Sequence, residues 1–401
     1  MPSIQSIGQP LVFKADPRSV ALKVPPQTDD EIVIRLQART LEGMQKEAVV
    51  HHGPSNTAWR MVSDEGPYLN GADLAPFPLA FFSAGMAFSF LSEIARHAEA
   101  HGVKITALSL VQDNFYTMEG SALRGDMLGG ARPVEMMVRI AASAPQETLV
   151  KIVKLAEASS PAQAYMRDVL QNTFALCHNG RAVDVTDVSP SSTPLHDDPE
   201  LHFEAVTPCN QAEFLPHIIT KRKAAEVVHG VEGGAGSSLK SEQKRILHVH
   251  AVAARRGDGL NEVEIQLLKP LGSTFRFVGD ERGASAPPSL AYLSAGVGFC
   301  YMTQLGRYAQ IVKMGLKSYS IVLDNAFKLS GSAQDKNLRI EAKPVDTHLF
   351  VNLDGPDESA RKLLKMGERT CFLHAAMRTR NPTQLRAEIN EELFEISPAS
   401  G

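Results

Sequence analysis

Cysteine is scarce in this sequence: the 401 residues contain four, at positions 177, 209, 300 and 371. Four cysteines are too few for the disulfide framework of a small secreted domain, so in a reducing compartment they serve as core thiols, metal ligands or redox groups. Cys177 and Cys209 have no Cys-x-x-Cys partner. We interpret both as structural and look for chemistry at Cys300 and Cys371.

Long runs of charge and long apolar runs are also missing. Charged residues make up 21% of the chain and the net charge is -4, without a basic stretch that would bind a polyanion. No apolar run reaches the ~18 residues that cross a bilayer, and the first residues, MPSIQSIGQPLVFK, do not resemble a signal peptide. The sequence therefore predicts a cytoplasmic protein with neither nucleic-acid nor membrane partners.

Several motifs of cofactor, hydrolase and metal chemistry do not occur. The chain has no Gly-rich phosphate loop, no G-x-S-x-G elbow and no H-E-x-x-H sequence, and no cofactor is predicted. His248 and His250 alternate along one expected strand, but two histidines without a third ligand do not define a metal site. No metal is therefore predicted.

The sequence contains an internal duplication. LAFFSAGMAFSFLSEIAR, at 79–96, returns as LAYLSAGVGFCYMTQLGR at 290–307, and the same 211-residue offset pairs Asp113-Asn114 with Asp324-Asn325 and Met166-Arg167 with Met377-Arg378. The identities in this ungapped register exceed what average residue usage gives by chance. Cys300 falls opposite Ser89 and Cys371 opposite Ser160, so only the second copy carries the two thiols.

The pattern of each copy predicts strands, a helix, further strands and a second helix, in that order, which is typical of an α+β fold. We expect repeats at 1–195 and 196–401, with antiparallel sheets and two long helices per repeat. In the first repeat the helices are expected at about 78–101 and 146–173, the second with a break at Pro161. In the second repeat they carry Cys300 and Cys371, and the Gly/Ser tract at 230–243 is expected to be a loop.

The residues around the two thiols resemble the OsmC/Ohr family. The resemblance rests on PSLAYLSAGVGFC at 288–300, two strands, and then a second helix with Cys371-Phe-Leu-His374. It covers about ninety residues of each copy. It implies an intertwined dimer with thiol sites at the subunit boundary, and here the two repeats would form that dimer within one chain.

The resemblance also implies roles for particular residues. Cys300 would attack a hydroperoxide, Cys371 would resolve the sulfenic acid, and a dithiol would reduce the disulfide. The family's arginine has two candidates, Arg60 and Arg276, and Arg60 is expected to support Cys300 from the other repeat. The family's acidic residue has no match, because Ser and Leu occupy 289 and 290 and Glu281 lies upstream in a loop.

Two further residues are supporting candidates. His374 lies three residues after Cys371 and would either stabilise a thiolate or face solvent. Arg307 lies on the Cys300 face of its helix, but Arg96 holds the matching place beside Ser89, which favours a structural role. The SAG tripeptides occur in both repeats and are expected to allow close helix packing.

Three functional classes follow, in this order. The first is a thiol-dependent peroxidase for organic hydroperoxides, with one working site because the first copy carries serines. The second is a cysteine-nucleophile enzyme acting on a small hydrophobic electrophile, as a lyase, hydrolase or isomerase. The third is a non-catalytic ligand-binding protein. All three take a small hydrophobic molecule, and association into a further homodimer is left open.

Overall fold

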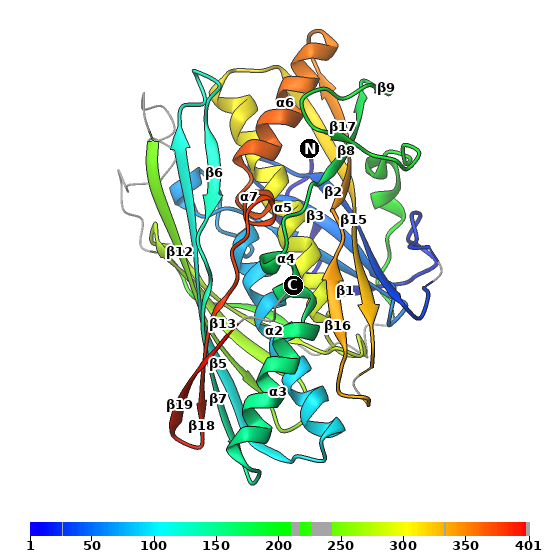
Figure 1. Cartoon of the computed structure of the whole chain (residues 1–401). Coiled ribbons are helices and arrows are strands. Elements are labelled where there is room, and N and C mark those ends of the chain that lie inside the picture. The colour runs from blue at the N-terminus through cyan, green and yellow to red at the C-terminus, as the bar shows by residue number, and fades with distance from the viewer. Residues whose placement is uncertain (26, 210–216, 226–242, 333, 398–401) are drawn as a thin grey trace.

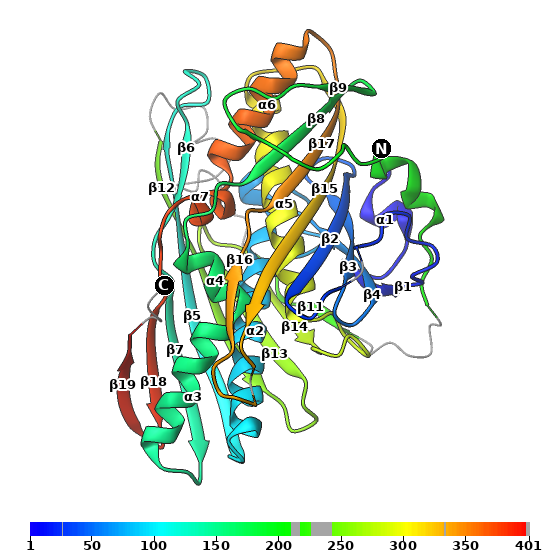
Figure 2. The same ribbon diagram turned by 45° about the vertical axis from the view of Figure 1, so that its right-hand side comes forward.

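Two long helices, α2 (Pro78–Ala100) and α5 (Ser289–Ile311), lie side by side between two β-sheets in the computed structural model (Figure 1). The structure describes residues 1–25, 27–209, 217–225, 243–332 and 334–397. Residues 230–242 of the tract expected to be a loop lie outside the described residues. Helix α2 packs on strands of one sheet and α5 on strands of the other, so the helices form the middle layer (Figure 2).

The first sheet has ten strands in the order β1-β4-β3-β2-β15-β17-β8-β10, with β16 on β15 and β9 on β8. Most neighbours are antiparallel, but β17–β8 and β8–β10 are parallel. Its strands are β1 (Val12–Ala15), β2 (Glu31–Thr40), β3 (Lys46–His52), β4 (Thr57–Ser63), β8 (Thr173–His178), β9 (Arg181–Val183), β10 (Ser189–Pro190), β15 (Leu316–Ser330), β16 (Arg339–Ala342) and β17 (Asp346–Leu353).

The second sheet has nine strands in the order β11-β14-β13-β12-β5-β7-β18-β19, with β6 on β5. It also contains one parallel pair, β18–β7. Both sheets are therefore mainly antiparallel, as expected, with parallel pairs where β8, β10 and β18 join. Its strands are β5 (Ile105–Gly120), β6 (Leu128–Ala131), β7 (Glu135–Ala142), β11 (Ile219–Lys223), β12 (Gln243–Arg255), β13 (Asn261–Lys269), β14 (Thr274–Gly279), β18 (Gln384–Ile389) and β19 (Glu392–Ile396).

Both halves of the chain contribute strands to both sheets. In the first sheet β2 pairs with β15, and in the second β12 pairs with β5. We call these two strand pairs the seams. Because each seam joins a strand from before residue 195 to one from after it, neither half completes a sheet by itself.

The remaining helices repeat at the same 211-residue offset as α2 and α5. They are α3 (Gln146–Ser159) with α6 (Asp357–Thr370), and α4 (Pro161–Arg167) with α7 (Phe372–Arg378). Short helices lie outside the repeat: α1 (Ile4–Ile7), η1 (Pro67–Leu69) and η2 (Pro199–Ala205). The second long helix expected in each repeat is therefore two helices. It breaks at Pro161 as predicted, and also at Cys371, where no proline stands.

The SAG tripeptides lie at the α2–α5 contact. A Cβ atom added to Gly85 would come 2.5 Å from the backbone nitrogen of Leu293, and one added to Gly296 would come 2.5 Å from that of Phe82. Such short separations show that the two helix backbones touch here, as the sequence predicts. Glycine at both positions allows this approach.

Helix α2 is long and apolar enough, by length and composition, to cross a membrane, contrary to the expectation that no segment is. Most of it is buried inside the structure. Its Phe81, Phe88 and Leu91 belong to one hydrophobic core that reaches both sheets. Its apolar character is accounted for by this position in the middle layer.

Several identities between the copies correspond to repeated contacts. Arg167 donates to Glu157 and Arg378 donates to Glu368, in each case across the turn between the two helices. Likewise Asn114 contacts Ser83 of α2, and Asn325 contacts Ser294 of α5. The serine and asparagine side chains are buried, so their hydrogen bonds satisfy polar groups in the core, whereas the arginine–glutamate pairs are only partly buried.

Candidate active site

The two thiols expected to act together lie in contact. The Sγ atoms of Cys300 and Cys371 are 3.5 Å apart, and both residues are reduced. A disulfide is about 2.05 Å long, so a modest movement would join them. Reactive cysteines are usually partly exposed, whereas Cys300 is 2% exposed and Cys371 is fully buried.

Cys371 occupies the junction between two helices and not the interior of one. It ends α6 and precedes α7 with an extended backbone, φ -69° and ψ 120°. Ser160 has nearly the same conformation between α3 and α4, φ -77° and ψ 119°, and its Oγ lies 2.9 Å from Ser89 Oγ. The serine pair therefore repeats the geometry of the thiol pair.

The surroundings of Cys371 favour its neutral thiol. Burial raises the pKa of Cys371 well above its usual value, and the hydrogen bond to Cys300 raises it further. The backbone amides of His374 and Leu373 act in the opposite direction but do not outweigh burial. These properties suit a thiol that gives up its proton only when it attacks a neighbouring sulfur.

Lys46 is a buried basic residue whose charge interacts with that of Cys300. Its side chain is buried at the start of β3, where its Nζ donates to the Met44 carbonyl over 2.6 Å. Burial lowers the pKa of Lys46, while Glu65, Asp64 and Cys300 oppose that shift through their charges. The sequence analysis missed this lysine because its nearness to α5 depends on how the sheet packs on the helix.

Near the serine pair, the described residue at the position that matches Lys46 is an asparagine. Lys46 pairs with Ser63, the residue before Asp64-Glu65, and in the other sheet Asn261 pairs with Gly279, the residue before Asp280-Glu281. Asn261 thus occupies the matching position. Its Nδ2 donates to Ser92 Oγ over 2.8 Å, so a neutral amide replaces the ammonium near the serines.

An acidic residue also lies beside the thiol helix, where the sequence search found none. Glu65, in the loop after β4, accepts a hydrogen bond from Thr303 Oγ1 over 2.8 Å, one turn after Cys300. The equivalent Glu281 accepts from Ser289 at the start of α5. An Asp-Glu pair directly after the third strand of each copy was the available signal.

Arg307 lies in the same charged group. Burial lowers its pKa, and the nearby charges of Glu65 and Tyr68 act against this shift. Its counterpart Arg96 forms an ion pair with Glu93. An arginine lies near a carboxylate in both copies, buried at Arg307 but 38% exposed at Arg96. The structural role of Arg307 stays a prediction.

The structure does not bring Arg60 or Arg276 to the thiols. Arg60 forms an ion pair with Glu47 at 2.6 Å, and Arg276 forms one with Glu262. Successive strand residues point to opposite faces, and the neighbours of Arg60 and Arg276 along β4 and β14 face the helices. Both arginines therefore lie on outer faces, which corrects the expectation that Arg60 supports Cys300.

His374 has neither of the expected environments. Its ring is fully buried against Tyr301 and Phe174, at centroid distances of 5.1 and 5.7 Å. Among the described residues neither ring nitrogen has a hydrogen-bond partner. Burial lowers its pKa to about 3, so the imidazole is neutral near pH 7 and supplies no positive charge to a thiolate.

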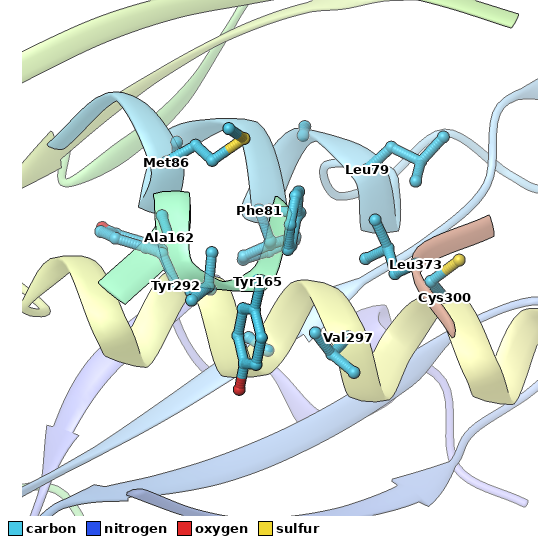
Figure 3. Close-up of a cluster of buried hydrophobic side chains, with 14 of the residues drawn as sticks. Leu79, Phe81, Met86, Ala162, Tyr165, Tyr292, Val297, Cys300 and Leu373 are labelled. Atoms are coloured by element: carbon cyan, nitrogen blue, oxygen red, sulfur yellow. The ribbon is translucent and has the colours of Figure 1, made fainter. Parts of the chain in front are cut away.

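Apolar side chains surround the thiols. Figure 3 shows Cys300 on α5 close to Leu373 of α7, with Leu79 of α2 nearby. The ring of Tyr116 packs on Phe372 at a centroid distance of 5.7 Å. Burial raises the pKa of Tyr116, and the charges of both cysteines raise it further. A molecule that reaches Cys300 would therefore meet hydrophobic surface.

The other two cysteines lie elsewhere. Cys177 packs with Val322 and Phe350 in a separate small cluster, and burial raises its pKa. Cys209 donates from its Sγ to the Ala15 carbonyl over 3.2 Å. Their interpretation as structural cysteines stays a prediction.

No protein-family model matches the chain, and no curated protein matches it. Among solved structures, it is similar to an OsmC-like hydroperoxide resistance protein from Jannaschia sp. CCS1, with 23% identity over 37% of this chain and 97% of that one. The TM-score is 0.26, so the structural likeness is weak and partial. Hydroperoxide resistance is a property of that protein.

Proposed function

We propose that this chain is a thiol-dependent peroxidase that reduces organic hydroperoxides through Cys300, with Cys371 as the resolving thiol. The observation that carries the proposal is the 3.5 Å contact between two reduced sulfurs. Two thiols in contact can be oxidised to a disulfide without a large rearrangement. The serine pair holds the same geometry but cannot undergo this reaction.

The reaction takes two steps and a reductive return. The Cys300 thiolate attacks the O–O bond of ROOH; with one proton taken up, this gives the sulfenic acid and the alcohol ROH. Cys371 then attacks that sulfur, forming a disulfide and releasing water. An external dithiol reduces the disulfide and is itself oxidised, so one hydroperoxide is consumed per cycle.

The charges and the lining support this assignment. Lys46 is a buried basic residue whose charge interacts with that of Cys300; such a group, when protonated, favours the thiolate of a neighbouring cysteine. The apolar neighbours Leu79, Leu373 and Phe372 favour an organic hydroperoxide over the smaller and more polar hydrogen peroxide. The site therefore fits a small hydrophobic substrate.

We further propose that the chain is a fused dimer of two OsmC-like repeats, 1–195 and 196–401, with one working site. Support comes from the common 211-residue offset of six helices and from the matched order of strands about the two seams. Cys300 and Cys371 come from the second repeat, whereas Lys46 and Glu65 come from the first. The first repeat is thus more than a scaffold, because it completes the thiol site.

One observation favours a second candidate. Both thiols are buried, so the pair could remain inaccessible and the protein could bind a ligand without turnover. The peroxidase proposal requires a local opening that admits the hydroperoxide. The two candidates differ in whether added hydroperoxide oxidises the pair.

The test is oxidation of the reduced protein with one equivalent of cumene hydroperoxide or hydrogen peroxide, followed by alkylation and mass spectrometry. We expect a Cys300–Cys371 disulfide, faster with cumene hydroperoxide, and continued turnover with a dithiol. Cys300→Ser should abolish the reaction. Cys371→Ser should stop at the sulfenic acid, and Ser89→Ala should react normally.

Lys46 provides the sharper variant. Lys46→Met should slow disulfide formation about tenfold, equivalent to roughly 1.4 kcal/mol in the barrier, while Lys46→Arg should retain most of the rate. Asn261→Ala is the matched control beside the serine pair and should leave the rate unchanged. If cumene hydroperoxide leaves both thiols alkylatable over hours, the non-catalytic candidate replaces the peroxidase.

A further inference from the structure

Three potential metal ligands meet on the outer face of the second sheet, across its seam. His248 Nε2 and His250 Nδ1 of β12 lie 2.6 and 2.8 Å from the same oxygen, Oδ1 of Asp113 on β5. The three ligand atoms lie within 4.8 Å of one another. The two histidines alone gave no metal prediction; the third ligand comes from strand pairing, which sets His250 opposite Asp113.

The three side chains are accessible to solvent, and the His248 ring is held by a neighbouring aromatic ring. The side chains of His248, His250 and Asp113 are 27%, 33% and 23% exposed, so an ion can enter from solvent. The His248 ring stacks on Phe115 at a centroid distance of 4.5 Å, which restricts its rotation. Gln266 lies opposite His250 and Glu135 opposite Asp113, while Lys269 lies opposite His248 beside a register shift.

The corresponding position of the first sheet is occupied differently. Asp324, at the 211-residue offset from Asp113, pairs across its seam with Arg35, which donates to both carboxylate oxygens over 2.8 and 2.7 Å. Val33 stands where the second sheet has His248. A guanidinium thus neutralises Asp324. For Asp113, the ion-pair partners among the described residues are the two histidines, which can act as neutral ligands.

We propose that Asp113, His248 and His250 bind one divalent transition-metal ion of the Zn²⁺ class, with water completing the coordination. Imidazole nitrogen and carboxylate oxygen are the usual ligands of such ions. Metal–ligand bonds of about 2.0–2.1 Å need the ligand atoms to separate by less than about 1 Å, which side-chain rotation provides. The ion would link β5 of the first half to β12 of the second, as Arg35–Asp324 links the other seam.

The test uses the full-length, tag-free, metal-stripped protein. Zn²⁺ is titrated by calorimetry, and Co²⁺ by visible absorption, where sulfur-to-cobalt charge transfer would reveal any ion held by cysteine. We expect one equivalent to bind without that sulfur signal. His250→Ala and Asp113→Asn should each weaken binding at least tenfold.

Asp324→Asn, the same change at the equivalent carboxylate, should leave Zn²⁺ affinity unchanged. Zn²⁺ should also raise the melting temperature of the unaltered protein but not of His248→Ala, and far-UV circular dichroism without metal checks that each variant folds. The proposal is overturned if Zn²⁺ does not bind saturably. It is also overturned if His248→Ala, His250→Ala and Asp113→Asn bind Zn²⁺ as tightly as the unaltered protein does. In that case the group is a set of histidine–carboxylate hydrogen bonds only.

Discussion

Single residues separate two sites that are otherwise built alike. Cysteine replaces serine at two positions, and Lys46 stands where the other sheet has Asn261. The backbone conformation at Cys371 and Ser160 is nearly the same, so the fold holds either pair. The proposed difference in chemistry therefore rests mainly on these three side chains, because the backbone is alike at the two junctions.

His374 makes the stability of the protein depend on pH. The imidazole is fully buried and its pKa is lowered to about 3, so below about pH 6.5 the unfolded chain binds a proton that the folded chain does not. The contribution of the neutral imidazole to the free energy of unfolding is therefore fully present above pH 6.5 and is lost as the pH falls toward 3. At pH 5 its contribution has decreased by about 2 kcal/mol.

His374→Gln introduces the residue that stands 211 positions earlier in the chain, Gln163. We expect the fall in unfolding free energy between pH 7.5 and pH 5 to be about 2 kcal/mol smaller in this variant, measured by urea denaturation. His217→Gln, at an exposed histidine, is the control. Equal pH slopes for the unaltered protein and His374→Gln would show that the buried imidazole does not control this loss.

At the scale of elements, the two central helices are fixed by the contact at Gly85 and Gly296. An added methyl group there meets backbone atoms, which cannot move aside as a flexible side chain can. The α2–α5 contact also sets where Cys300 lies relative to α7 and to the sheet that carries Lys46. Helix packing and site geometry are therefore linked.

Gly85→Ala should consequently destabilise the protein. We expect a loss of about 1–3 kcal/mol, typical of overpacking a core, although alanine favours helix more than glycine does. Gly257→Ala, where an added Cβ meets no atom within 4 Å, should change stability by less than about 0.5 kcal/mol. Thermal or urea unfolding of both variants decides this, and equal stabilities would exclude a tight helix contact.

At the scale of the whole molecule, the seams make the halves mutually dependent. A fragment of residues 1–195 keeps β2 and β5 but loses their seam partners, β15 and β12. Each would then present an unpaired central strand edge, a template for self-association. We expect this fragment to aggregate or to pair with itself, whereas co-expression with 196–401 restores a soluble complex.

Size-exclusion chromatography and circular dichroism of the fragment, alone and co-expressed, test this dependence. A monomeric 1–195 fragment that melts cooperatively would contradict it. The two halves would then be separate domains in the energetic sense, despite their shared sheets.

The sequence by itself determined the features that depend on local pattern and on the repeat. The 211-residue register predicted the helix pairs, the close approach at Gly85 and Gly296, and the match of Cys300 with Ser89 and of Cys371 with Ser160. The pairing of the two thiols was implied by the resemblance to the OsmC/Ohr family. Periodicity predicts where the helices lie, and the register predicts which residues occupy matching positions in the two halves of the chain.

Only the tertiary structure decided which distant side chains face those places. The sequence predicted Arg60 near Cys300, but in the structure the basic residue that interacts with Cys300 is Lys46. Glu65 lies in a loop and bonds to the thiol helix, and Asp113 lies beside His248 and His250. A one-residue change of strand phase moves a side chain to the opposite face of a sheet, and strand pairing across a seam joins residues more than a hundred positions apart. Neither the phase at Arg60 nor the partner of β12 is encoded in a local pattern, so the charged groups of both sites became visible only in the folded chain.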